Sequence, residues 1–168
     1  MGHSAEAGSW SSRSPAETRA LARGLAAALG AEGAVVSLVG ALGAGKTEFA
    51  KGLAEGLGLT ASVLASPTFT IAHELPLAAR AGAPARLVHA DWFRVHSEAE
   101  LDAAGLDDWL APGVVLAVEW GDRFPAALGA ETLEVRLEES AEGSRRVEAS
   151  ARGVRAAAVL ARWRQRCP

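Results

Sequence analysis

The spacing of apolar residues along the chain predicts three long helices. Residues 15–29 begin at a Ser-Pro pair, which is typical of a helix start, with Ser14 as the cap and Glu17 placed to complete a capping box. Apolar residues recur every three or four positions over 48–57 and again over 154–165. In the first two helices the predicted buried residues are Leu21, Leu25 and Leu29, then Phe49, Leu53 and Leu57. Each helix therefore offers an apolar face to a core, and the last one has a basic outer face.

Short apolar runs predict the central strands of a sheet. Residues 34–39, 86–90 and 114–118 are mostly apolar, a pattern typical of parallel strands that are covered on both faces. Helical segments separate these runs, and they include a short acidic helix over 97–105. Strands that alternate with helices indicate a parallel sheet.

The last third of the chain has a different pattern. Residues 132–138 and 146–150 alternate between apolar and polar, which is typical of half-exposed antiparallel strands, and Gly143 supplies a turn between them. The Ala- and Pro-rich residues 75–84 are expected to form a hairpin tip or a loop. We therefore predict a three-layer α/β fold whose mainly parallel sheet is extended by C-terminal antiparallel strands.

Length, charge and cysteine content suit one compact domain. The 168 residues are enough to bury a core, so we predict a single domain over 1–168, with 1–13 as a flexible leader. A net charge of −3 argues against a protein that coats nucleic acid through many basic contacts. Cys167 is the only cysteine, and no apolar run approaches the roughly 18 residues that span a bilayer. These features favour a cytoplasmic protein with no membrane partner.

The segment Gly40–Thr47 has the sequence GALGAGKT, which fits the phosphate-binding pattern G-x-x-x-x-G-K-[ST] at every fixed position. A predicted strand precedes it and a predicted helix follows, as a P-loop NTPase requires. Glycines let the backbone approach triphosphate oxygens, and the helix N-terminus favours negative charge there. Lys46 would reach the β- and γ-phosphates, while the Thr47 hydroxyl would ligate Mg²⁺. The residues expected to contact the nucleotide here are Gly40, Leu42, Gly43, Ala44, Gly45, Lys46, Thr47 and Glu48.

Two acidic residues follow predicted parallel strands, where a phosphate loop needs a second group to hold Mg²⁺. Glu119 ends the most apolar strand and Asp91 ends another, so we expect both carboxylates at the site. Trp120, directly after Glu119, would either stack on a base or seal the edge of the core.

Other residues leave alternatives open or narrow the ligand. Residues 65–71 would form a loop that senses Mg²⁺ or the γ-phosphate through Thr68, or a plain β-strand, and periodicity alone favours the strand. His89 and His96 have no partners at metal-ligand spacing, so structural roles are expected. The chain contains no asparagine, so the Asn-Lys-x-Asp element that recognises guanine is absent and adenine is favoured.

Four motifs, in order, resemble those of the TsaE (YjeE) family, bacterial ATPases needed to make threonylcarbamoyladenosine (t6A37) in transfer RNA. The family typically shows G-D-L-G-A-G-K-T, S-P-T-[FY]-T, H-x-D-x-Y-R and V-E-W. The corresponding segments here are Gly40–Thr47, Ser66–Thr70, His89–Arg94 and Val118–Trp120. The resemblance extends from the first predicted helix to the last predicted strands.

The resemblance implies an ATPase that works on a partner complex, formed by the TsaD and TsaB proteins, and meets tRNA only through that complex. It implies that Thr47 and Glu119 hold Mg²⁺. The resemblance also implies that the segment with Thr68 is a switch-like loop, which reverses the preference for a plain strand there. An arginine before the last strand, either Arg145 or Arg146, would approach the nucleotide, and Arg146 is assigned to that role. The residues expected to act in hydrolysis are Lys46, Thr68, Asp91 and Glu119.

Three residues depart from the family pattern. Ala41 replaces the usual Asp, and Phe93 replaces the usual Tyr. Glu48 stands where a second Thr is common, close to the expected position of the α-phosphate. A carboxylate there would repel phosphate, so Glu48 is expected to weaken ATP binding.

The sequence thus favours Mg²⁺-dependent ATP binding and slow hydrolysis in support of the t6A modification complex. A small-molecule kinase is one alternative, but residues 78–85 are short and nearly uncharged for the basic lid that such enzymes usually carry. A nucleotide-gated binding module without useful turnover is the other.

Overall fold

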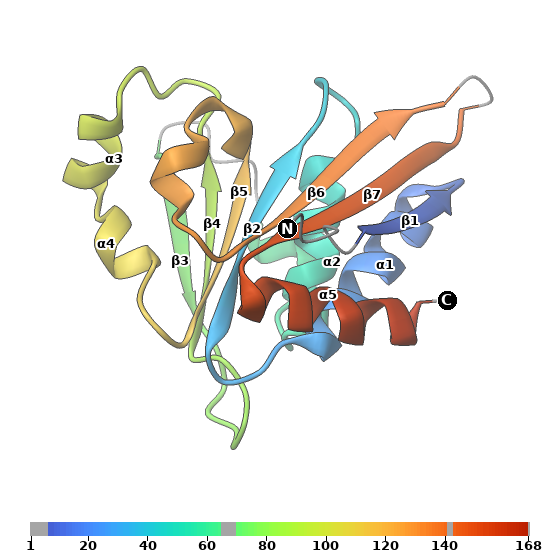
Figure 1. Ribbon diagram of the computed structural model, residues 1–168, viewed down its shortest axis with the longest axis horizontal. Helices are drawn as coiled ribbons and strands as arrows, with labels where there is room; N and C mark the ends of the chain where they lie inside the picture. The colour runs from blue at the N-terminus through green and yellow to red at the C-terminus, as the bar shows by residue number, and fades with distance from the viewer. Residues whose placement is uncertain (1–6, 65–69, 141–142, 168) are drawn as a thin grey trace, which may run out of the picture.

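The structure, a computed structural model, describes residues 7–64, 70–140 and 143–167. The strands are β1 (Ala7–Ser12), β2 (Gly33–Val39), β3 (Ala72–Pro76), β4 (Arg86–Asp91), β5 (Val114–Glu119), β6 (Thr132–Glu139) and β7 (Arg145–Arg152). The helices are α1 (Pro15–Ala28), α2 (Lys46–Gly56), α3 (Glu98–Ala104), α4 (Leu106–Trp109) and α5 (Val154–Arg166). The strands form one seven-stranded sheet in the order β1-β7-β6-β2-β5-β4-β3 (Figure 1).

The centre of the sheet is parallel and its edges are antiparallel. Strand β2 pairs in parallel with β5 and with β6, and β5 pairs in parallel with β4. Strand β7 pairs antiparallel with β6, as predicted for the C-terminal strands. The opposite edge is also antiparallel, because β3 forms a hairpin with β4. The expected hairpin tip over 75–84 is shorter than predicted, since residues 75 and 76 belong to β3.

Residues 7–12 form strand β1, so the prediction of a flexible leader over 1–13 is wrong for them. Strand β1 pairs antiparallel with β7, and its residues contain no apolar run that would mark a strand in the sequence. The ring of Trp10 lies 4.2 Å from that of Trp163, centroid to centroid, and its Nε1–H donates to the carbonyl of Cys167 at 2.5 Å. Tertiary contacts with the end of the chain therefore order this segment.

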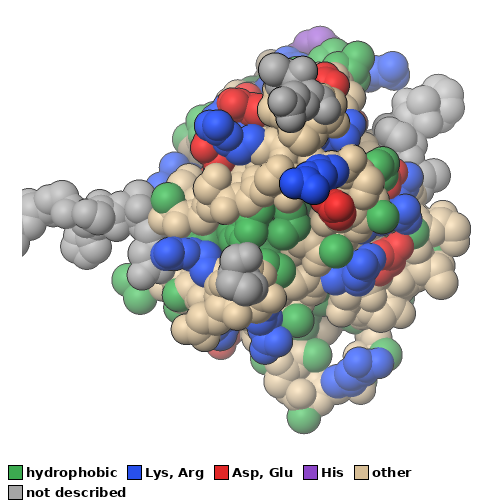
Figure 2. Space-filling view, turned by 90° about the vertical axis from the view of Figure 1, so that its right-hand side faces the viewer, with side chains coloured by type: hydrophobic (Ala, Val, Ile, Leu, Met, Phe, Trp, Pro, Cys, Tyr) green, Lys and Arg blue, Asp and Glu red, His purple; other side chains and the backbone are tan. Residues whose placement is uncertain are grey.

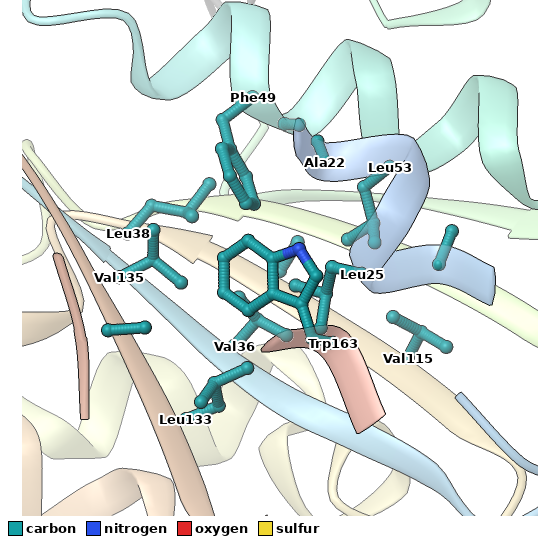
Figure 3. Packing of buried hydrophobic residues seen from close by; sticks show 14 of the residues in the cluster. Ala22, Leu25, Val36, Leu38, Phe49, Leu53, Val115, Leu133, Val135 and Trp163 are labelled. Carbon is teal, nitrogen blue, oxygen red and sulfur yellow. The ribbon is translucent and has the colours of Figure 1, made fainter. Parts of the chain in front are cut away.

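Helices cover both faces of the sheet, which confirms the three-layer α/β prediction. On one face α1, α2 and α5 bury Leu25, Phe49 and Trp163 against side chains of β2, β5, β6 and β7 (Figure 3). On the other face Leu101 of α3 and Trp109 of α4 pack over β4 and β5. Phe49 and Leu53 are fully buried as predicted, but Leu21, Leu29 and Leu57 are only partly buried.

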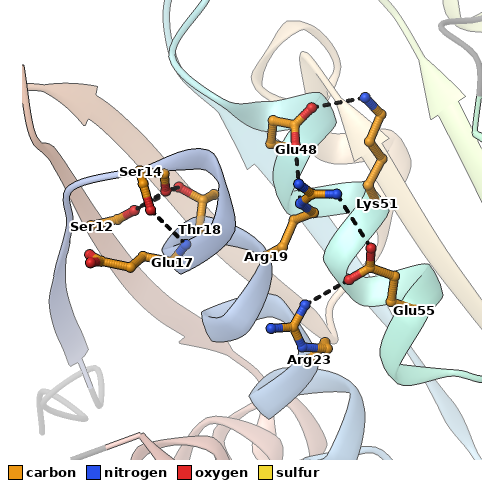
Figure 4. Close-up of polar contacts among 9 residues, drawn as sticks. All are labelled: Ser12, Ser14, Glu17, Thr18, Arg19, Arg23, Glu48, Lys51 and Glu55. Atoms are coloured by element: carbon orange, nitrogen blue, oxygen red, sulfur yellow. Dashed lines mark hydrogen bonds and ion pairs between the residues drawn. The ribbon is translucent and has the colours of Figure 1, made fainter.

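Helix α1 begins at a capping residue and packs closely against α2. The Ser14 hydroxyl accepts the N–H of Glu17 at 3.1 Å (Figure 4). The Glu17 carboxylate accepts the N–H of Arg13 and not that of Ser14, so the predicted capping box forms only in part. Gly52 lets the two helices approach closely, because a Cβ there would lie 2.4 Å from the carbonyl oxygen of Arg19.

The exposed side of α5 carries the expected basic face. The α5 arginines Arg155, Arg162, Arg164 and Arg166 are all exposed. Figure 2, which views the molecule from the side of β1 and the end of α5, shows Lys and Arg side chains around a small hydrophobic area. No helix in the described part of the chain is long and apolar enough to cross a membrane.

Candidate functional site

The loop over 40–45 connects β2 to the first turn of α2, in the order that the motif predicts. A residue with a side chain would not fit at Gly40, because its Cβ would lie 2.4 Å from the carbonyl oxygen of Leu137 on β6. Gly45 has φ +108 and directly precedes the helix, a backbone conformation that glycine adopts without strain. At the tip of the loop, the side chain of Leu42 is 86 % exposed. The loop is therefore held against β6 at one end and turns into α2 at the other.

Lys46 lies inside this loop and is only 4 % exposed. Its Nζ donates to the carbonyl oxygens of Gly40 at 2.7 Å and Ala41 at 2.8 Å, and lies 4.0 Å from the centroid of the Trp120 ring. Burial lowers the pKa of Lys46, and the nearby carboxylates of Glu119, Asp91 and Asp122 oppose that shift. The ammonium group is therefore surrounded by loop carbonyls, an aromatic face and acidic side chains.

Thr47 and Glu119 meet, although 72 positions separate them in the chain. The Thr47 hydroxyl lies 3.0 Å from each oxygen of the carboxylate of Glu119, a residue that is only 5 % exposed. A hydroxyl and a carboxylate are the oxygen ligands that Mg²⁺ prefers, so these two residues suit that ion. Within the described ranges no three or more His, Cys, Asp or Glu side chains form a group that could hold a metal.

Asp91 lies beside Glu119 at the carboxyl edge of the sheet, because the register of β4 and β5 pairs these two residues. One oxygen of Asp91 accepts the N–H of Phe93 at 2.9 Å and so supports the turn after β4. The two acids that were predicted from their positions at strand ends therefore lie side by side at the carboxyl edge of the sheet.

Trp120 bridges the loop and the turn after β4. It has φ +62, the one positive φ of a non-glycine residue in the described part of the chain, and its N–H donates to the Leu38 carbonyl at 3.0 Å. Its ring lies over Lys46 and 5.0 Å from the ring of Phe93, centroid to centroid. The side chain therefore covers the lysine at the sheet edge, and stacking on a base stays a prediction.

The two arginines expected before the last strand are the first two residues of β7, and of these Arg145 contacts the loop. Its Nε donates to the Ala44 carbonyl at 2.9 Å and its Nη2 to the Gly43 carbonyl at 3.4 Å. Arg146 pairs with Glu148 at 3.5 Å and its side chain is 64 % exposed. The assignment of Arg146 to the site is therefore corrected to Arg145, since neighbouring residues of a strand point to opposite faces.

Glu48 does not have the surroundings expected of it. Its carboxylate lies 2.8 Å from the Lys51 ammonium and 3.3 Å from Nε of Arg19 on α1 (Figure 4). Glu55 extends this network, because it pairs with Arg19 and Arg23. Two cations balance the charge of Glu48 and its side chain ties α2 to α1, so we now expect its repulsion of phosphate to be small.

Replacing Glu48 with threonine should therefore lower stability and leave nucleotide affinity within about twofold. Loss of the partly exposed network is expected to lower the free energy of unfolding by about 1 kcal/mol and Tm by about 2–4 °C. Thermal melts and calorimetric ATP titrations measure the two effects. Glu98→Thr, in the exposed first turn of α3, is the control for removing an acid from a helix start. An affinity gain of severalfold in Glu48→Thr would restore the original expectation.

Two features of the sequence stand apart from this geometry. Thr68 lies outside the described residues, so the switch-like loop and the plain strand both stay open there. His89 was expected to be only structural, yet its Nε2 lies 2.8 Å from Oε1 of Glu119. The sequence did offer a signal for this contact. Residues 89 and 91 are two positions apart on a strand, so their side chains point to the same face, and Asp91 was already expected at the site.

Asp122 was not singled out in the sequence. Its negative charge acts on Lys46 from the turn after β5, three positions beyond Glu119. Nothing in a short Gly-Asp-Arg turn distinguishes such an acid from a solvated one.

Comparison with known proteins agrees with the four motifs. A sequence model of the family described as "Threonylcarbamoyl adenosine biosynthesis protein TsaE" matches residues 12–147. The tRNA threonylcarbamoyladenosine biosynthesis protein TsaE of Bacillus subtilis is 38% identical over 151 residues, which cover 87% of each chain. The protein of the same name from Mycobacterium leprae is 43% identical over 112 residues, which cover 63% of this chain and 67% of that one. The crystal structure of B. subtilis YdiB superposes with a TM-score of 0.76 and 32% identity over 98% of both chains.

Proposed function

Since the chain belongs to the TsaE family, which acts in threonylcarbamoyladenosine biosynthesis, we propose that it binds Mg²⁺ and ATP at Gly40–Thr47 and hydrolyses the ATP slowly. The observation that carries this proposal is the contact of Thr47 with the buried carboxylate of Glu119, directly beside Lys46. A phosphate loop, its lysine, a hydroxyl and an acid on the next strand are the parts that nucleoside triphosphate hydrolysis requires.

Each group has a role that follows from its charge. The loop N–H groups and Lys46 bind the phosphates, and Thr47 and Glu119 hold Mg²⁺. When bound, Mg²⁺ would neutralise negative charge on the phosphates. Asp91 adds a carboxylate that faces the same edge, and Arg145 adds a guanidinium at the loop. Trp120 limits access of water to the lysine.

The ATPase is proposed to act on a partner complex of the TsaD and TsaB proteins and to contact tRNA only through that complex. Slow turnover by the isolated chain and faster turnover in the complex are expected. The nucleotide is proposed to be ATP, since the chain lacks the asparagine with which guanine is recognised in GTPases.

Phosphate release from Mg²⁺ and ATP, with and without the TsaD–TsaB complex, tests the proposal. Free phosphate at a slow rate that rises with the complex is the expected result. Transfer of phosphate to a small acceptor without free phosphate would instead indicate a kinase. Tight ATP binding with no phosphate release in either condition would indicate a binding module.

Replacing Arg145 with alanine should weaken ATP binding by about tenfold, which corresponds to about 1.4 kcal/mol. The guanidinium supports the loop through two carbonyls and adds positive charge beside it. Arg146→Ala is the matched control, because that side chain is exposed and pairs with Glu148, and its affinity should stay within twofold of wild type. Calorimetric titration compares the two. Equal effects of both variants would contradict the assignment of Arg145.

A further inference from the structure

His89 is buried in the middle of the sheet, and its polar contact is with the carboxylate assigned to Mg²⁺. The residue is 0 % exposed, and its Nε2 lies 2.8 Å from Oε1 of Glu119. Its other nitrogen, Nδ1, is buried and has no hydrogen-bond partner among the residues that the structure describes. Leaving that nitrogen unpaired costs free energy, which an apolar side chain in the same place would not cost. What the imidazole contributes here is therefore the donor to Glu119.

The two partners of Glu119 differ in what they specify. An ionised carboxylate only accepts hydrogen bonds, so the His89 tautomer beside it carries its proton on Nε2. The Thr47 hydroxyl lies equally far, 3.0 Å, from both carboxylate oxygens and has one proton to donate, so it does not select either oxygen. His89 contacts Oε1, which distinguishes that oxygen from Oε2.

We propose that His89 is a positioning residue, which holds Oε1 of Glu119 through Nε2–H and so fixes the carboxylate orientation in which Oε2 serves Mg²⁺ or its water. This inference rests on the proposed Mg²⁺ and ATP function, and it assigns to the histidine a role other than core packing. Donors behind metal-binding carboxylates hold them in place, and their removal typically lowers metal affinity or activity by roughly 10-fold to 100-fold.

Two variants separate positioning from packing. His89→Gln keeps an amide donor near the place of Nε2, whereas His89→Asn ends near the place of Nδ1 and is too short to reach Glu119. The probe is ADP, titrated by calorimetry at a series of Mg²⁺ concentrations and in EDTA. His89→Asn should need about tenfold more Mg²⁺ for half of the Mg²⁺-dependent gain in ADP affinity, with the affinity in EDTA within twofold of wild type. His89→Gln should need no more than about threefold more Mg²⁺ than wild type.

The background of Glu119→Gln provides the matched control. With the carboxylate gone, His89→Asn should change the Mg²⁺ dependence by less than twofold, because the effect acts through Glu119. If His89→Asn responds to Mg²⁺ as wild type does, the positioning role is overturned and the proposed function stands. If ADP affinity of the wild type does not depend on Mg²⁺, the proposed function fails and the inference fails with it.

A measurement on the wild-type protein avoids dependence on a variant that fails to fold. Nitrogen-15 NMR of the imidazole groups reports which nitrogen carries the proton. The expected result is an Nε2–H tautomer for His89 whose proton resonance shifts when Mg²⁺ is added to the ADP complex. An Nδ1–H tautomer, or a resonance that does not respond to Mg²⁺, would overturn the proposal.

Discussion

Replacing Lys46 with alanine is expected to lower ATP affinity at least about 100-fold, or about 2.7 kcal/mol. The side chain is the one lysine within the phosphate loop, and its ammonium is placed among loop carbonyls by hydrogen bonds of 2.7 and 2.8 Å. Hydrogen bonds from a charged donor to phosphate are stronger than neutral ones, and Arg145, another cation at the loop, donates to the carbonyls of Gly43 and Ala44 instead of those held by Lys46. Calorimetric titration with ATP measures the loss.

The control for Lys46→Ala is Lys51→Ala, which removes a lysine from the same helix. Lys51 pairs with Glu48. The ATP affinity of the Lys51→Ala protein should stay within about twofold of wild type. Thermal melts belong to this comparison, since Lys46 is buried and also holds the carbonyls of Gly40 and Ala41. A folded Lys46→Ala protein that binds ATP within threefold of wild type would rule out the phosphate-binding role.

Replacing Glu119 with glutamine should separate binding from turnover. Glutamine keeps the volume and most hydrogen bonding of the side chain but removes the negative charge that faces Thr47. Loss of a group that organises the charge of a transition state typically lowers the rate on the order of 100-fold to 1000-fold. The rate of phosphate release should fall by that range, while ATP affinity changes by less than about tenfold because Lys46 and the loop stay in place.

An exposed acid provides the control for Glu119→Gln. Glu138→Gln on β6 removes the same charge from the protein at a site open to solvent, so its hydrolysis rate should match wild type. Phosphate release at saturating ATP and Mg²⁺ compares the three proteins. A near wild-type rate in Glu119→Gln would mean that another acid, such as Asp91, serves Mg²⁺.

Local pattern predicted most of the elements near the site. The phosphate loop, the apolar strand before it and the helix after it are neighbours in the chain, so the backbone conformation of each depends on residues within a few positions. Glu119 and Asp91 were found because parallel strands end at one edge of a sheet, a rule that needs only the strand ends. The helix start at Ser14 was equally local, since cap and partner lie three residues apart.

Contacts between distant segments required the tertiary structure. Strand β1 exists because β7 and Trp163 bind it, and its own residues have little preference for a strand. The choice of Arg145 over Arg146 depended on the face of β7 that meets the loop. Side-chain direction on a strand reverses with each residue, so a shift of one position in register would exchange these two arginines.

The sequence by itself determined the fold class, the phosphate loop and the residues Lys46, Thr47, Asp91 and Glu119, because each depends on local spacing or on a strand end. Only the tertiary structure decided how charged and polar side chains pair. Glu48 pairs with Arg19 and Lys51, and His89 contacts Glu119. A buried or partly buried polar group forms its hydrogen bond or ion pair with whichever partner the fold places within reach. Such pairings depend on distances across the sheet and between helices, which no spacing along the chain specifies.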